Sequence, residues 1–210
     1  TRFRSTSTGT GSALMPALPA VPASLPRRHS NLGQKLGLWL LKLLGGWSIQ
    51  GELPAHKKMV IAVAPHTSNQ DFFVGIAAAL ALDLKIRFLG KHSIFVWPVK
   101  RLLISLGGIA VDRSHRHGVV GQVVAEFEQS DALLLGLSPE GSRKKVQQWR
   151  SGFWFIAKQA NVPVCLVGLD YHHKQLVFGP CFTAGENFAD DLPQMRAFFQ
   201  QMTAKYPENA

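Results

Sequence analysis

The chain has 210 residues and a mass of 23.1 kDa, which fits one domain with a short tail and excludes a long repeat array. It is 46% hydrophobic and 17% charged, so it can bury a core and is not disordered throughout. Its net charge is +10, and its two cysteines, Cys165 and Cys181, allow at most one bridge, so we expect no disulfide framework and a reducing compartment.

The excess positive charge lies near the N-terminus. Residues 1–60 contain eight basic side chains against one acidic side chain, Glu52, a balance of +7. Nucleic acid and an anionic membrane surface both attract such a segment. Residues 1–30 are rich in Ser, Thr, Gly, Pro and Ala and have no apolar periodicity, which predicts a disordered basic leader without a signal peptide.

Residues 31–50 are predicted to form an amphipathic helix. Lys35 and Lys42 lie off its apolar stripe, which is too short to cross a bilayer because crossing needs about 20 apolar residues. Two interpretations fit equally: a helix lying in the membrane surface, or a helix that packs its stripe against the domain's own core. The stripe consists of Leu32, Leu36, Trp39, Leu40, Leu43 and Trp47.

Residues 51–210 alternate between short β-rich runs and helical stretches, which predicts one α/β domain. The order favours a mostly parallel central sheet with helices on both faces, and it places the site in loops at the carboxyl ends of strands. Strands are predicted at residues 59–64, 86–89, 108–111, 132–137, 164–169 and 175–178. Helices are predicted at residues 72–82, 95–106, 118–128, 152–160 and 192–205.

The loop after the first of these strands contains a histidine and an aspartate, five positions apart. Histidine takes up a proton near neutral pH, and a carboxylate can orient its ring. His66 and Asp71 are therefore a candidate general base and its orienting partner. The alternative is that Asp71 only caps the following helix and that His66 is a solvated loop residue.

A second candidate region follows the strand at residues 132–137. Gly141 allows close backbone approach, and Arg143 offers a planar set of donors that suits a phosphate. Lys144 and Lys145 raise the local potential, so the segment is a candidate anion site, although the same residues also describe an ordinary turn with a solvated basic face. A third element, residues 107–113, ends in a charged pair that includes Arg113.

Other features favour structural interpretations. His172-His173 and His115-x-His117 have no accompanying cysteine or carboxylate set, so we interpret them as surface histidines and predict no metal site. The sequence has no Gly-x-Ser-x-Gly elbow, Walker loop or Gly-x-Gly-x-x-Gly at a strand end. This argues against a serine hydrolase, a P-loop NTPase and a dinucleotide enzyme.

Taken together, four blocks resemble the glycerolipid acyltransferase superfamily typified by 1-acylglycerol-3-phosphate acyltransferase. The resemblance covers about half of the chain, in the family's order, with Ser142 in place of the family's threonine. The blocks are His66-x4-Asp71, residues 108–113 ending in Asp-Arg, Glu140-Gly141-Ser142-Arg143, and Val-Pro-x3-Val at residues 162–167.

The resemblance implies transfer of a fatty acyl group from acyl-CoA or acyl-carrier protein to a hydroxyl of a lysophospholipid, with 1-acylglycerol 3-phosphate the first choice. His66 would be the general base and Asp71 its partner. No resident cofactor is implied. The acceptor's phosphate would be bound by Arg113, Arg143 and Lys91, in a pocket shaped by Glu140, Gly141 and Ser142.

The leading hypothesis from the sequence is therefore a monotopic enzyme on the cytoplasmic face of a membrane. Its partners would be membrane lipids and the acyl donor, and not nucleic acid; its oligomeric state is left open. The alternative is a non-catalytic lipid-binding module that keeps the acyltransferase fold. A nucleic-acid binder is a poorer third hypothesis, which predicts a steep loss of DNA affinity with salt.

Overall fold

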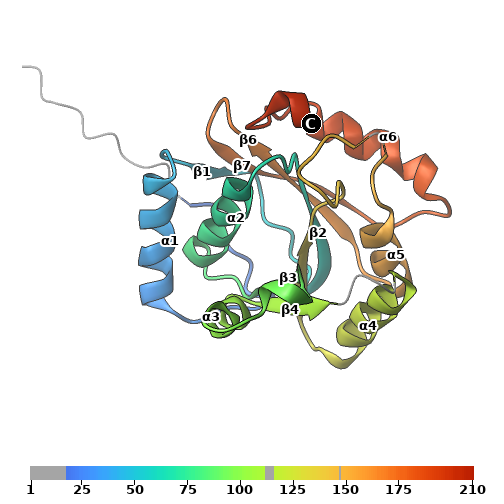
Figure 1. The fold of residues 1–210 in the computed structure, drawn as a ribbon, viewed down its shortest axis with the longest axis horizontal. Coiled ribbons are helices and arrows are strands. Elements are labelled where there is room, and N and C mark those ends of the chain that lie inside the picture. Colours follow the sequence, from blue (N-terminus) through green and yellow to red (C-terminus); the bar gives the residue numbers. More distant parts are fainter. Residues whose placement is uncertain (1–17, 112–115, 147) are drawn as a thin grey trace, which may run out of the picture.

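The computed structural model describes residues 18–111, 116–146 and 148–210 and has an α/β fold (Figure 1). The strands are β1 (Ser48–Gln50), β2 (Lys58–Ala64), β3 (Ile86–Lys91), β4 (Gly108–Val111), β5 (Leu133–Leu137), β6 (Val164–Asp170) and β7 (Gln175–Phe182). The helices are α1 (Asn31–Leu43), α2 (Asn69–Ala81), α3 (Val99–Ser105), α4 (Arg116–Gln129), α5 (Gly152–Gln159) and α6 (Phe188–Phe199), with short 3-10 turns η1 (His92–Ile94) and η2 (Pro207–Asn209).

The seven strands form one mostly parallel sheet in the order β1-β7-β6-β2-β5-β3-β4. Every neighbouring pair is parallel except β6 and β7, so β1 and β7 run opposite to the other five strands. The predicted sheet is confirmed. Because β2 lies between β6 and β5, the loops that follow these three strands meet at one edge of the sheet.

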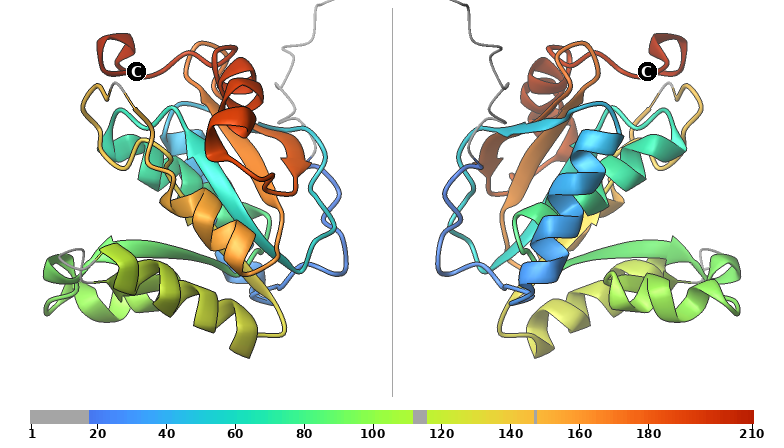
Figure 2. Two further views of the ribbon diagram at one scale, coloured as in Figure 1. Left: turned by 90° about the vertical axis from the view of Figure 1, so that its right-hand side faces the viewer. Right: turned by 90° about the vertical axis from the view of Figure 1, so that its left-hand side faces the viewer.

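Helices cover both faces of the sheet, as predicted. Along β2, Met59 and Ile61 belong to a core shared with α1 and α2, whereas Val60 and Ala62 belong to a core shared with α4, α5 and α6. This alternation follows from the two-residue period of a strand. Figure 2 shows α5 and α6 toward the viewer from one side and α1 from the other.

Helix α1 packs on α2 through a face that the stripe prediction did not identify. Gly37 and Leu41 are its buried residues, and a Cβ atom on Gly37 would lie 2.3 Å from the backbone nitrogen of Ala81. Most of the predicted stripe points outward instead, since four of its six members are exposed: Leu32 (80%), Leu36 (46%), Trp39 (58%) and Leu43 (65%). Packing of the whole stripe against the core is therefore wrong.

The helix also ends earlier than residue 50. It stops at Leu43 because Gly45 and Gly46 adopt positive φ angles of 121° and 77°, which reverse the chain. Trp47 is then buried, and residues 48–50 form β1 beside β7 instead of a further helical turn. None of the helices in the described ranges is both long enough and apolar enough to cross a membrane.

The C-terminal helix is shifted from its predicted position. It was expected at residues 192–205, but α6 begins at Phe188 and ends at Phe199. The chain leaves the helix because Thr203 makes tertiary hydrogen bonds in place of helical ones: its N–H donates to Asp170 and its carbonyl accepts from the N–H of Tyr171. Residues 200–206 thereby return toward the carboxyl end of β6.

The two cysteines lie opposite each other on β6 and β7. Cys165 and Cys181 are register partners in the antiparallel pair and are joined by a disulfide, the single bridge that the sequence allows. Directly opposed residues of antiparallel strands lie only about 4.5 to 5.5 Å apart at Cα. The strand register thus brings the two side chains together, whether they are bonded or reduced.

Candidate functional site

The loop between β2 and α2 carries the predicted histidine, and the first turn of α2 carries the aspartate. Ser68 is the N-cap of α2, and its hydroxyl accepts a hydrogen bond from the N–H of Asp71, while the Asp71 carboxylate accepts from the N–H of Ser68 at 2.7 Å. This reciprocal capping box fixes the start of the helix. Asp71 is therefore part of the helix cap, as the structural interpretation predicted.

Asp71 also faces His66. The His66 Nδ1 atom lies 3.3 Å from Asp71 Oδ2, and 25% of the His66 side chain is exposed against 1% of the Asp71 side chain. One aspartate thus caps the helix and orients the imidazole. Within the described residues, the other ring nitrogen of His66, Nε2, has no hydrogen-bond partner.

Tyr171 completes this centre, although the sequence analysis did not identify it. Its hydroxyl donates to Asp71 Oδ1 at 2.5 Å, and its ring packs edge-on against Trp47 with centroids 4.8 Å apart. Tyr171 lies 100 residues from Asp71, so no local motif joins them. The available signal was topological: Tyr171 directly follows β6, which neighbours β2.

These contacts determine the charge state of the centre. Burial alone would raise the pKa of Asp71, but hydrogen bonds from His66, Tyr171 and Ser68 outweigh it and hold that pKa below its ordinary value. Burial, followed by the hydrogen bond to Asp71, raises the pKa of Tyr171. At neutral pH the centre therefore contains an ionised carboxylate and a neutral phenol.

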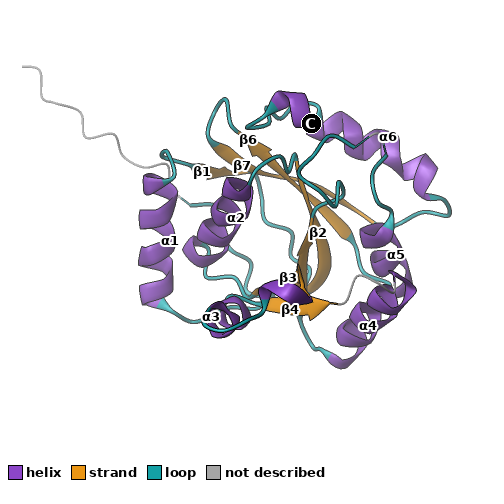
Figure 3. Ribbon diagram, in the orientation of Figure 1, coloured by secondary structure: helices purple, strands orange, loops and turns teal. Residues whose placement is uncertain are grey.

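Glu140 lies in the loop that follows the neighbouring strand, β5, and its side chain holds the loop that contains His66. Its carboxylate is buried and accepts a hydrogen bond from the backbone N–H of His66 at 2.8 Å. Burial raises the pKa of Glu140 in spite of this bond. In Figure 1 the yellow loop after β5, which carries Glu140, lies beside the loop that precedes α2, and Figure 3 draws both segments as loops. Glu140 thus fixes the backbone at the histidine and ties the two loops together.

The residues after Glu140 form a turn that exposes cationic side chains. Gly141 has a φ of 63°, and a Cβ atom there would lie 2.4 Å from Cδ of Arg150. The hydroxyl of Ser142 bonds within the turn, accepting from the N–H of Lys144 at 3.0 Å. Arg143 is exposed, and its guanidinium donates to the side-chain oxygen of Asn69 at the start of α2.

The remaining predicted site residues are only partly located. Arg113 lies outside the described residues, as does His115. Lys91 is the last residue of β3, but its side chain is outside the described part of the chain. His172 and His173 are exposed, and His173 pairs with Asp170 at 2.5 Å. No group of three potential metal ligands occurs among the described residues.

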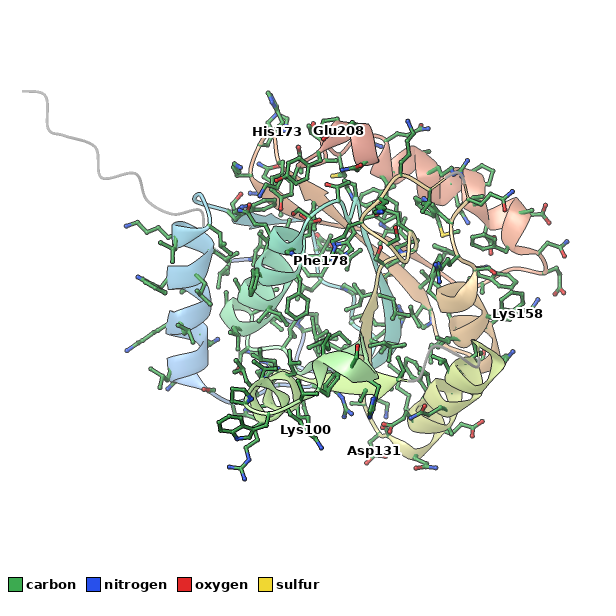
Figure 4. All side chains as sticks on the ribbon, in the orientation of Figure 1. Lys100, Asp131, Lys158, His173, Phe178 and Glu208 are labelled. Atoms are coloured by element: carbon green, nitrogen blue, oxygen red, sulfur yellow. A yellow bond between two sulfur atoms is a disulfide. The ribbon has the colours of Figure 1, made fainter. Side chains whose placement is uncertain are left out.

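A large cavity extends from the histidine into the molecule. It has a volume of about 1940 Å³, and both His66 and Asp71 contribute to its wall together with Arg143. Phe178 of β7, which points toward the middle of the molecule beside α2 (Figure 4), lines it as well. The other walls are largely apolar and include Phe72, Ile76, Phe88, Leu89, Val120 and Phe155.

Comparisons with known proteins agree with the fold. The family model described as Acyltransferase matches residues 48–170. The crystal structure of the 1-acyl-sn-glycerophosphate (LPA) acyltransferase PlsC from Thermotoga maritima is similar to the chain with a TM-score of 0.61 and 16% identity, over 80% of this chain and 76% of that one. A search of curated protein sequences gives no significant match.

Proposed function

The chain belongs to the acyltransferase family, and from that premise we propose that it transfers a fatty acyl group from a thioester to a hydroxyl of a lysophospholipid, with 1-acylglycerol 3-phosphate as the acceptor. The donor is acyl-CoA or acyl-carrier protein. The observation that carries the proposal is the His66–Asp71 pair at the wall of an apolar cavity that also reaches Arg143. Such a cavity can accept an acyl chain beside a base and a cation.

The proposed reaction is a direct acyl transfer. His66 removes the proton from the acceptor hydroxyl as its oxygen attacks the thioester carbonyl, and Asp71 stabilises the imidazolium that forms. The tetrahedral intermediate then collapses, the carbon–sulfur bond breaks, and the thiolate takes the proton from the imidazolium. An ester and a free thiol result, and the imidazole is neutral again.

The test is acyl transfer from a labelled thioester to lysophosphatidate by the full chain, with His66→Ala beside it. We expect a loss of about 10²- to 10⁴-fold in turnover, the usual contribution of a general base. The same activity in the variant would contradict the proposal. A lipid-binding module without catalysis would bind vesicles but give no turnover with either class of donor.

We further propose that the protein lies on the cytoplasmic surface of a membrane through the outward faces of α1 and of the η1–α3 segment. The second segment exposes Ile94, Val96, Trp97 and Leu102, of which Trp97 is 88% exposed. Exposed Lys35, Lys42, Lys100 and Arg101 accompany the two apolar faces, and Lys100 points away from the sheet (Figure 4). Apolar side chains beside cations suit an anionic lipid surface.

The two apolar faces are tied together. The guanidinium of Arg28, three residues before α1, donates to the carbonyls of Ser105 and Leu106 at the end of α3, at 3.0 and 2.7 Å. Vesicle flotation with anionic lipids tests the proposal: Trp39→Glu should reduce binding, whereas Ala197→Glu on α6, across the molecule from α1 (Figure 1), should not. Equal binding by both variants would contradict it.

A further inference from the structure

A second, polar pocket lies beside the catalytic loop. It has a volume of about 340 Å³, within the usual range for small-ligand sites. It lies between the start of α2, the turn after β5 and the segment that follows α6. Its lining residues are Thr67, Ser68, Asn69, Gln70, Arg143, Lys205 and Tyr206.

Two cations from distant parts of the chain meet in this pocket. The Arg143 guanidinium donates to the side-chain oxygen of Asn69, and the Lys205 ammonium donates to that of Gln70 at 2.5 Å. Two consecutive neutral amides therefore hold the two cations. Of the acidic residues that the structure describes, none lines the pocket and none forms an ion pair with Arg143 or Lys205.

The position of Lys205 is fixed on two sides. The side-chain amide of Gln70 donates to the carbonyl of Leu44, the C-cap of α1, at 3.2 Å, which leaves its oxygen directed to Lys205. The next residue, Tyr206, donates its backbone N–H to the hydroxyl of Thr67 at 3.2 Å. The C-terminal segment thus closes the pocket over the loop that carries His66.

The polar pocket adjoins the apolar cavity, because Asn69 and Arg143 line both. A ligand with an apolar chain at one end and an anion at the other would match this arrangement. We propose that Lys205 is a further cation for the phosphate of the acceptor, beside Arg143, and that it determines the preference for a phosphate monoester over a diester or a neutral head group. This inference rests on the proposed acyl transfer and assigns to it a residue that determines acceptor specificity.

The charges explain why a monoester would be preferred. A phosphate monoester is close to a dianion at neutral pH, since its second pKa is about 6, and it matches two cations that have no acidic partner. A zwitterionic diester brings one negative charge and its own cation, and a neutral head group brings none. Charge-assisted hydrogen bonds from both sides would therefore favour the monoester.

Direct binding of a small probe tests the pocket without turnover. Titration of the full chain with glycerol 3-phosphate, followed by calorimetry or phosphorus NMR, should show saturable binding that Lys205→Gln weakens about tenfold and Lys205→Arg largely preserves. The matched control is Lys57→Gln, an exposed lysine just before β2 at the opposite end of the strand. Equal binding by Lys205→Gln and the control, or no saturable binding, would overturn the proposal.

Kinetics then identify the source of the phosphate. With lysophosphatidate, Lys205→Gln should raise KM about tenfold and leave kcat nearly unchanged, and with monoacylglycerol, which has no phosphate, the penalty should disappear. A rise confined to the KM of the acyl donor would instead assign the pocket to the donor's phosphates and overturn the proposal.

The two proposals fail in different ways. If no thioester is turned over but glycerol 3-phosphate binding still depends on Lys205, the acyl transfer is wrong and the anion pocket stands. If acyl transfer depends on His66 but neither binding nor KM responds to Lys205→Gln, only the pocket is wrong.

Discussion

The proposed catalytic centre and the cationic pocket are neighbours, but their side chains are held by different numbers of contacts. Asp71 is buried and receives hydrogen bonds from Ser68 and Tyr171 as well as facing His66. In the pocket, Arg143 is exposed, and one side-chain amide holds each cation. Reacting groups need several contacts that fix their geometry, whereas a cation with a single amide partner still attracts an anion through its charge. Substitutions in the centre should therefore lower kcat, and substitutions in the pocket should raise KM.

Asp71→Asn should give the largest effect and the sharpest separation of the two regions. Asparagine can still cap α2, so the fold should persist, but the amide cannot stabilise an imidazolium. We expect kcat to fall about 100-fold or more, since general base catalysis contributes about that much. Affinity for glycerol 3-phosphate should stay within twofold of the parent. A loss of affinity as large as the loss of kcat would contradict the separation of the two regions.

Glu140 tests how far the centre depends on its backbone support. Glu140→Ala leaves the partly buried N–H of His66 without its acceptor, which should cost about 1 kcal/mol in free energy of unfolding, whereas Glu140→Gln keeps a carbonyl oxygen there and should cost less. Urea denaturation measures both. If alanine and glutamine prove equally stable, the contact has no stabilising role.

Tyr171→Phe should have a smaller effect of a different kind. The ring and its packing on Trp47 remain, but Asp71 loses one hydrogen bond, so its carboxylate is held less firmly beside His66. We expect kcat to fall about 3- to 10-fold, because an ordinary hydrogen bond contributes about 0.5 to 1.5 kcal/mol. The pKa of Asp71 should also rise, because the hydrogen bond from Tyr171 helps to lower it, and loss of packing alone would not cause that rise.

The smallest effect concerns acid stability. Hydrogen bonds hold the pKa of Asp71 below its ordinary value of 3.8, so the folded state binds its proton less tightly than the unfolded state. The resulting stabilisation is complete above that value and is lost as pH falls through the lower folded pKa. Denaturant titrations should therefore show the parent losing more stability than Asp71→Asn below pH 3.8. Equal losses of stability in the parent and in Asp71→Asn would show that ionisation of Asp71 does not stabilise the folded state.

The sheet and most of its helices follow from local patterns, because buried strands and helical stripes leave a period in the sequence. The pairing of His66 with Asp71 was predictable because the two residues are only five positions apart, between the end of β2 and the first turn of α2. β1 was missed because it has three residues and exists only through its pairing with β7. The end of α6 was misplaced because tertiary bonds of Thr203 replace helical ones.

The residues that sequence reasoning missed at the site act over long distances. Tyr171 and Lys205 lie 100 and 135 residues from Asp71 and Gln70, their respective partners, so only the folded topology brings them together. The orientation of α1 was undecided because the helix is apolar on two sides. The glycine at position 37, where no side chain fits against α2, was the feature that marked its inward face.

The close contact between Gly37 and α2 affects the distance between His66 and a membrane that α1 contacts. No methyl group fits between α1 and the backbone of Ala81, so the two helices pack as one rigid unit. α2 is about 20 Å long, and its first turn lies beside His66. If Trp39 and its neighbours lie at the bilayer surface, this helix pair determines the distance between the His66 imidazole and that surface. That distance then determines which hydroxyl of the glycerol can approach His66, and therefore which carbon is esterified.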